Sequence, residues 1–386
     1  MKILQMLADG KITAEDAARL LDAITDRRPT ASPGPGFADE IKQTVEDVIQ
    51  SIPKESIAEV KDALREVYRE GRDAAHQWRR WAHRGWGAKF HFSRGEGHMA
   101  TAPFEETRTT SAGRLVLRNT RGDVRLSRSG DGQVRVRALR RVWAPDQREA
   151  ERLVERLSIE IREEGEALIV EGPGARPFHE RIRVDFDIEV PERLSVEVHL
   201  VRGDVHVETL TQTLAVSVVK GDLHVDGCAG IAAQVTSGDV SVRHCGGDAA
   251  IHTTRGDVQL TQASGDTAVS TRRGDVSFRS DRASRVAISA MRGDISVHVR
   301  EFAAGASAAV RTLHGDVSVA VPASARCRFD ASTLSGDVRS SLPLRDVTAD
   351  RGRLSGVLNS PDVAVTASAT HGDISLALVA EAAVAP

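Results

Sequence analysis

The residues with the most regular spacing in this chain belong to a repeated triplet of glycine, aspartate and an aliphatic residue. A column of such carboxylates could hold Ca²⁺, because hard cations prefer oxygen ligands. The chain lacks the nine-residue GGxGxDxUx repeat of calcium-binding β-rolls, however. We therefore interpret the triplet as a structural turn, in which glycine supplies a positive φ and aspartate accepts hydrogen bonds from backbone amides. The turn residues are Gly203-Asp204, Gly221-Asp222, Gly238-Asp239, Gly256-Asp257, Gly274-Asp275, Gly293-Asp294 and Gly315-Asp316, with further copies beginning at Gly122, Gly336 and Gly372.

A basic residue precedes most of these glycines. We expect this cation to lie beside the aspartate and to offset the repulsion between stacked carboxylates without a metal ion. The residues concerned are Arg121, Arg202, Lys220, Arg255, Arg273 and Arg292, with His314 and His371 in the equivalent place.

Two further pairs of residues repeat at one position of neighbouring units. Cys228 and Cys245 each follow their glycine by seven residues, which predicts Cα atoms near 5 Å apart, within disulfide range. In the cytoplasm, two reduced thiols filling one position are favoured over a disulfide. A redox or metal site is less favoured, because Cys327 lies far along the repeat. His206 and His224 also share a position, but two ligands do not make a zinc site.

No catalytic or cofactor-binding pattern is present. The sequence contains no GxSxG, GxxxxGK[ST] or HExxH motif. No catalytic, cofactor or metal residue is therefore predicted, and the glycines are spread through turns.

The spacing of the triplets defines the fold that would position them. From Gly203 the intervals are 18, 17, 18, 18, 19, 22, 21 and 36 residues. Apolar or small residues recur at positions −5, −3, +2 and +4 from the glycine, as in Val216, Val218, Leu223 and Val225. The step from −3 to +2 is odd, so the Gly-Asp pair must turn the chain for both pairs to point inward. Two strands and two turns per unit predict a β-solenoid, a mainly β, β-helix-like repeat. The 36-residue interval is interpreted as two periods, with a degenerate turn at Ser355-Gly356-Val357.

The part of the chain before the repeat is predicted to be helical. Residues 1–25 read as a minimal helical hairpin, 26–36 as a Pro/Gly/Ser linker, and 37–99 as a helical and basic-aromatic connector. The β-repeat domain then covers 100–379, followed by a tail at 380–386. Residues 145–156 are expected to form one helix within the lead-in strands, with Asp146 as its N-cap.

Trp78, Arg79, Arg80, Trp81 and Trp86 interleave cations with three of the four tryptophans. Such a segment could contact an anionic membrane, with tryptophan at headgroup depth and arginine on lipid phosphate. The alternative is a helix end whose tryptophans dock on the β domain, and a nucleic-acid contact is the least favoured.

The bulk composition limits the function classes. The net charge is −3, which argues against a general nucleic-acid binder. The first residues lack a long apolar run and a cleavage site, and no stretch reaches the roughly 18 apolar residues of a membrane span. The cytoplasm is therefore the expected location, with a peripheral position at the inner membrane face as the alternative.

The repeated Gly-Asp-Val, the Val-Pro elements at Val190-Pro191 and Val321-Pro322, and the helix-bearing lead-in resemble the DUF4097 family, the "putative adhesin" β-repeat domain. The resemblance covers about residues 100–379. The helical hairpin predicted for residues 1–25 resembles the SHOCT-like module that precedes such repeats in YvlB-type proteins of bacterial envelope-stress systems. The resemblance implies a non-enzymatic protein, with some relatives linked to envelope stress.

Three functional hypotheses remain at this stage. The favoured one is a non-catalytic scaffold that binds a protein partner or itself through the N-terminal helices. The second is a self-assembling, bactofilin-like filament, which needs an uncapped apolar end such as Leu376–Val379. The third is a carbohydrate-active enzyme on the solenoid, which would need aromatic sugar platforms that this chain hardly offers.

Overall fold

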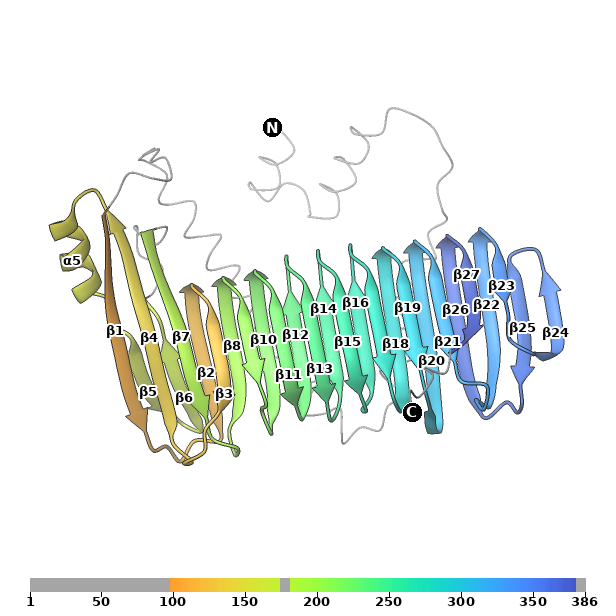
Figure 1. The fold of residues 1–386 in the computed structure, drawn as a ribbon, viewed down its shortest axis with the longest axis horizontal. Coiled ribbons are helices and arrows are strands. Elements are labelled where there is room, and N and C mark those ends of the chain that lie inside the picture. Colours follow the sequence, from red (N-terminus) through yellow and green to blue (C-terminus); the bar gives the residue numbers. More distant parts are fainter. Residues whose placement is uncertain (1–97, 174–180, 380–386) are drawn as a thin grey trace, which may run out of the picture. The chain divides into compact units, whose positions relative to one another are not determined.

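The computed structural model describes residues 98–173 and 181–379, and these form two long, parallel-rich sheets that face each other (Figure 1). Sheet A contains, in spatial order, β1 (His98–Arg108), β4 (Val134–Ala144), β7 (Ile182–Val190), β3 (Val124–Arg128), β9 (Val205–Glu208), β11 (Leu223–Cys228), β13 (Val240–Cys245), β15 (Val258–Ala263), β17 (Val276–Ser280), β19 (Ile295–Val299), β21 (Val317–Val321), β27 (Ile374–Leu378) and β23 (Val338–Ser340).

Sheet B contains, in spatial order, β24 (Arg345–Asp350), β25 (Arg353–Leu358), β22 (Cys327–Ser335), β26 (Val363–His371), β20 (Phe302–His314), β18 (Ala283–Arg292), β16 (Thr267–Thr271), β14 (Ala249–Thr253), β12 (Gly230–Val235), β10 (Thr213–Lys220), β8 (Ser195–Arg202), β2 (Arg114–Arg121), β6 (Ala167–Glu171) and β5 (Glu160–Glu164). The predicted mainly β, solenoid-like architecture is confirmed.

Each coil of the repeat contributes one strand to each sheet. In the coil around Gly221, Val216 and Val218 of β10 and Leu223 and Val225 of β11 are at most 2% exposed. The four predicted inward positions are therefore confirmed, and a single apolar cluster runs between the sheets. Neighbouring coils pair in parallel without register shifts through β9–β19 and β8–β16.

The N-terminal end of the stack is closed by antiparallel elements. β4 pairs antiparallel with both β1 and β7, and β5 pairs antiparallel with β6. Helix α5 (Gln147–Glu155) packs Ala150 and Val154 against Ala100 and Val142 of β1 and β4. Asp146 caps this helix, since its carboxylate accepts a hydrogen bond from the Glu149 amide at 2.8 Å. The predicted helix and its cap are thus confirmed.

The C-terminal end of the stack differs from the expectation. β27 lies between β21 and β23, and β26 lies between β20 and β22, so the last coil of the sequence is inserted before the coil of Gly336 (Figure 1). The interpretation of the 36-residue interval as two stacked periods is therefore wrong.

Gly356 belongs to β25, which pairs antiparallel with β22 opposite Phe329. It is followed by Val357, so this segment lacks the carboxylate of the Gly-Asp turn, and Gly356 is absent from the glycines with positive φ. The predicted degenerate turn does not form. The segment instead makes a hairpin with β24, whose six residues are all exposed.

The apolar C-terminal strand is consequently internal. Leu376 is 1% exposed within β27, which has neighbours on both sides. The outermost strands at this end are β23, with three residues, and the charged β24. Short or charged edge strands resist pairing with another chain, so Leu376–Val379 does not supply the open end that the filament hypothesis requires.

Candidate functional site: the Gly-Asp corner

All ten glycines of the repeated triplet have a positive φ, between +131° and +148°. A side chain at Gly256 would also meet the backbone directly, since a Cβ there would lie 1.9 Å from the Gly238 carbonyl oxygen in the coil before. The equivalent glycines stack in the same way along the stack. Glycine is thus required both by conformation and by the close approach of neighbouring coils.

The aspartates form a continuous hydrogen-bonded ladder along this corner. The Asp257 amide donates to Asp239 Oδ1 at 2.8 Å, and the Asp275 amide donates to Asp257 Oδ1 at 2.8 Å. The ladder begins at Asp185 of β7 and continues through Asp123, Asp204, Asp222, Asp239, Asp257, Asp275, Asp294, Asp316, Asp373 and Asp337. Bonds from an amide to an ionised acceptor are among the stronger hydrogen bonds in proteins, so each carboxylate ties its coil to the next.

Asp257→Ala is expected to destabilise the chain by about 1–3 kcal/mol, because it leaves the Asp275 amide without its acceptor. Asp257→Asn keeps an oxygen acceptor and removes one charge from a column of like charges, so its cost is expected to stay below about 1 kcal/mol. Thermal unfolding followed by circular dichroism measures both, with and without CaCl₂. Calcium-dependent stabilisation of the unaltered chain, lost equally in both variants, would contradict a turn role and support a metal site.

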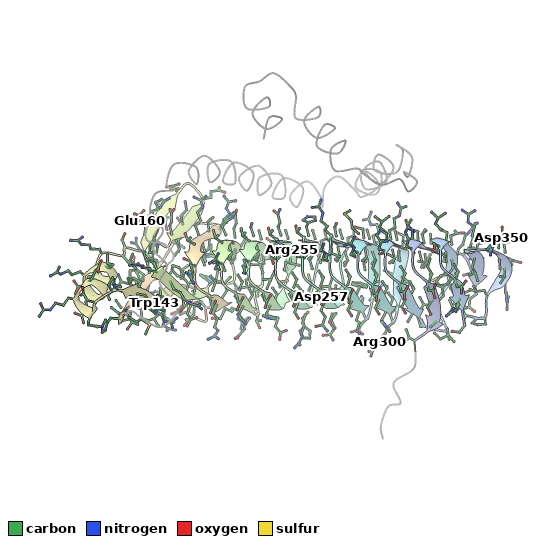
Figure 2. All side chains as sticks on the ribbon, turned by 90° about the horizontal axis from the view of Figure 1, so that it is seen from above. Trp143, Glu160, Arg255, Asp257, Arg300 and Asp350 are labelled. Carbon is green, nitrogen blue, oxygen red and sulfur yellow. The ribbon has the colours of Figure 1, made fainter. Side chains whose placement is uncertain are left out.

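Five of the cations that precede the glycines form no ion pair with these aspartates in the part of the chain that the structure describes. Figure 2 shows Arg255 on one side of the corner and Asp257 on the other. Among the described residues, no ion pair joins Arg202, Lys220, Arg255, Arg273 or Arg292 to a turn aspartate. The expectation that these cations lie beside the turn aspartates is therefore wrong, since a residue before the turn and a residue after it leave the corner toward opposite faces.

Aspartates of the ladder are paired with arginines at both ends of the stack. Arg183 pairs with Asp123, and Arg339 lies 3.1 Å from Asp337 and 3.8 Å from Asp373. Between these ends a shallow groove of about 980 Å³ follows the outer face of sheet A. Its floor is formed by the aspartates and by the serines two residues after them, such as Ser277 and Ser296.

Comparison with known proteins assigns the part of the chain that contains this corner to a family. The family model described as Toastrack DUF4097 matches residues 112–377, well over half of the chain. The chain belongs to the Toastrack DUF4097 family. A SHOCT-like domain model matches residues 1–28, so both resemblances inferred from the sequence are confirmed.

The solved structures that match this chain are distant in sequence. A "putative adhesin" from Parabacteroides distasonis is 11% identical, covers 71% of this chain and 97% of its own, and has a TM-score of 0.34. A "putative lipid binding protein" from the same organism is 11% identical, with coverages of 74% and 98% and a TM-score of 0.28. A "putative cell adhesion protein" from Clostridium sporogenes is 12% identical, with coverages of 72% and 100% and a TM-score of 0.21. None of the curated proteins compared with the chain matches it.

The cysteine and histidine pairs lie where the Toastrack repeat predicts. Cys228 and Cys245 are register partners on β11 and β13, and both are buried and free. A hydrogen bond between the two thiols and burial together raise the pKa of Cys228, and burial raises the pKa of Cys327 to about 12. The rings of His206 and His224 lie 5.0 Å apart. Within the described residues, no group of three or more potential ligands is arranged to hold a metal ion.

A second Gly-Asp corner, which the sequence analysis missed, closes part of the opposite edge of the Toastrack coils. The Asp266 amide donates to Asp248 Oδ1 at 2.9 Å, and Asp266 pairs with Arg285 at 2.9 Å. The dipeptides Gly247-Asp248 and Gly265-Asp266 are themselves the signal that could have revealed it, since they are 18 residues apart.

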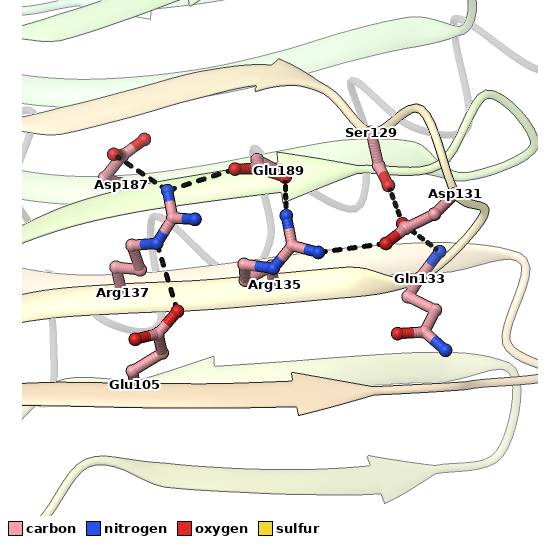
Figure 3. Close-up of polar contacts among 8 residues, drawn as sticks. All are labelled: Glu105, Ser129, Asp131, Gln133, Arg135, Arg137, Asp187 and Glu189. Atoms are coloured by element: carbon pink, nitrogen blue, oxygen red, sulfur yellow. Dashed lines mark hydrogen bonds and ion pairs between the residues drawn. The ribbon is translucent and has the colours of Figure 1, made fainter.

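A cluster of ion pairs on the outer face of sheet A was also missed. Figure 3 shows Arg135 and Arg137 of β4 between acidic side chains of its neighbours. Arg137 lies 3.2 Å from Glu105 and 3.0 Å from Glu189, while Arg135 also pairs with Glu189 and lies 2.9 Å from Asp131. These partners satisfy one another across β1, β4 and β7, so the cluster holds the end of the stack together.

Trp78, Arg79, Arg80, Trp81 and Trp86 lie outside the described residues, as do the predicted hairpin at 1–25, the linker and the tail. Within the part of the chain that is described, no helix has the length and apolar character needed to cross a membrane.

Proposed function

We propose that this chain is a non-catalytic scaffold that presents columns of identical side chains to a binding partner. The observation that carries this proposal is the parallel register, which repeats one side-chain type at one outward position from coil to coil. The carboxylates of the Gly-Asp corner support the proposal further, because one oxygen of each accepts a hydrogen bond from the backbone amide of the next coil. A groove of this kind offers a long recognition surface in place of an enclosed reaction site.

The N-terminal part of the chain completes the proposal. The SHOCT-like hairpin and the connector through residue 99 would mediate self-association or docking on a protein partner, while the β-repeat domain serves as the rigid body. Trp78, Trp81 and Trp86, with Arg79 and Arg80, would contact an anionic membrane from its cytoplasmic side. On the strength of the family resemblance, we propose a bacterial envelope-stress or regulatory setting for this scaffold, without a small-molecule substrate.

Light scattering combined with small-angle scattering tests this proposal on the full chain, with and without anionic vesicles. Leu20→Glu alters the apolar face of the hairpin, and the triple variant Trp78→Ala/Trp81→Ala/Trp86→Ala alters the aromatic segment. We expect an oligomer that Leu20→Glu reduces in mass and vesicle binding that the triple variant weakens. A monomer indifferent to vesicles and to both variants would overturn the proposed role of the N-terminal region.

A further inference from the structure

Exposed apolar side chains in the described residues concentrate at one position of the repeat. Eight large hydrophobic residues are exposed, and four of them stand two residues before a turn glycine. These four are Val201 at 39%, Val219 at 48%, Met291 at 49% and Leu334 at 82% exposure. The position points outward at the end of the sheet B strands, so the four residues belong to one column on one face.

The cations that precede the turn glycines stand beside this apolar column. Arg202 and Lys220 are register partners, as are Arg292 and His314. Parallel strands lie about 4.8 Å apart, so the column from Arg202 to Arg292 extends over roughly 24 Å. We call the two columns together the basic-apolar ridge, and it comprises Val201, Arg202, Val219, Lys220, Arg255, Arg272, Arg273, Met291, Arg292, Leu313, His314 and Leu334.

The ridge contains a shallow hollow of about 610 Å³. Arg255, Arg272, Arg273 and Arg292 line it together with Met291 and His314. None of the ion pairs among the described residues involves these four arginines. Four guanidinium groups around an apolar side chain, without an ion-pair partner among the described residues, form a site for an anion that is attached to a hydrocarbon.

The sheet face next to the ridge carries small side chains. Ala215, Ala232 and Ala250 are successive register partners on its outer side, and the column continues through Ala268, Ala287 and Ala309. Short side chains let a broad, flat surface approach this face closely. Asp257 of the carboxylate ladder lies on the opposite side of the corner from Arg255 (Figure 2). The ladder would therefore not repel an anionic surface that approaches this face.

The geometry points to an anionic lipid bilayer as the partner of the basic-apolar ridge. Cations in a straight line would meet lipid phosphates, while Val201, Val219 and Met291 would enter the boundary between headgroups and acyl chains. A nucleic acid would use the cations but would gain little from the aliphatic column, and the ridge carries no Phe, Tyr or Trp for base stacking. This surface lies on the repeat domain, so the inference goes beyond the proposed function and does not depend on the tryptophan segment.

Flotation of the full chain with vesicles of phosphatidylcholine and phosphatidylglycerol tests the inference. The ridge variant is Arg255→Glu/Arg273→Glu/Arg292→Glu, and all three residues are exposed. The matched control is Arg125→Glu/Arg243→Glu/Arg279→Glu, which changes the net charge equally through exposed arginines of sheet A. Each cation at an anionic surface contributes roughly a factor of five, so the ridge variant is expected to bind on the order of 100-fold more weakly. The control should retain most of the binding.

The same comparison in the Trp78→Ala/Trp81→Ala/Trp86→Ala background separates the two surfaces. If only the tryptophan substitutions weaken vesicle binding, the ridge inference fails while the proposed function stands. If only the ridge variant weakens binding, the ridge inference stands and the tryptophan segment loses its membrane role. Equal loss in the ridge variant and its sheet A control would also overturn the ridge inference, because total charge would then explain the binding.

A fluorescent probe reports whether the ridge itself meets lipid. An environment-sensitive label on Met291→Cys is selective, since the three native thiols are buried. We expect a blue shift with anionic vesicles, no shift with phosphatidylcholine alone, and no shift from a label on Ser375→Cys of sheet A. A shift produced equally by single-stranded DNA or by soluble glycerol phosphate would overturn the assignment to a bilayer.

Discussion

Gly256→Ala is expected to destabilise the β-repeat domain by about 4 kcal/mol or more, one of the largest effects that a single methyl group could have in this chain. A non-glycine residue at a φ of +136° is strained, and its Cβ would lie 1.9 Å from the Gly238 carbonyl oxygen. That oxygen belongs to the backbone of the neighbouring coil, so the clash can be relieved only by separating two coils. The thermal midpoint, followed by circular dichroism, should fall by roughly 10 °C.

Gly130→Ala is the matched control for this substitution. Gly130 is exposed in the loop between β3 and β4, and a Cβ there would meet nothing within 4 Å. Its φ is not among the positive values, so the control should change the midpoint by no more than a degree or two. Similar midpoints for the two variants would show that the corner tolerates a side chain and would contradict the requirement for glycine in the Gly-Asp turn.

The local parts of this fold could be predicted because they depend on short-range rules. Alternation along a strand fixes which of Val216 and Ser217 points inward, and a glycine followed by aspartate marks the corner wherever it occurs. The same rules found α5 and its cap, since Asp146 precedes a helical pattern. Each of these inferences uses residues within a few positions of one another.

The order of the coils could not be predicted because neighbouring coils are nearly interchangeable. Val317, Ile374 and Val338 occupy equivalent positions, and any of them could follow another in a parallel ladder. The order is set by the elements that end the stack. The hairpin of β24 and β25 occupies one side of β22, and the coil of Gly372 takes the other side.

The sequence also did not reveal on which side of the corner each charged side chain lies. Arg255 and Asp257 are two residues apart, which on one straight strand would place them on the same face. Gly256 lies between them at a positive φ and turns the chain, so they leave toward opposite faces. The cations and the aspartates were expected to form one mixed column, but they form two separate columns on opposite faces. The candidate lipid-binding ridge follows from that separation.

In a chain that ends after Asn359, the strands at the C-terminal end of the stack are expected to detach from the rest of the repeat. The truncation removes β26 and β27, and with them the pairings of β20 with β26, β26 with β22, β21 with β27, and β27 with β23. Phe329, which is 1% exposed in the complete chain, would lose β26, one of the two strands that flank it. Residues 326–359 would then have no parallel partner in the described domain.

Limited proteolysis with mass spectrometry measures this outcome. Cleavage within residues 326–359 should accelerate on the order of 100-fold, because a segment that has lost its strand partners opens with little free-energy cost. A chain that ends after Val379 keeps every described strand and serves as the control. If the coils instead stacked in the order of the sequence, the truncation would remove only the outermost coil, and β22 would stay paired with β20. Protection of residues 326–359 in the truncated chain would therefore contradict the inserted position of the last coil, because nearest-neighbour contacts alone stabilise a repeat of this kind.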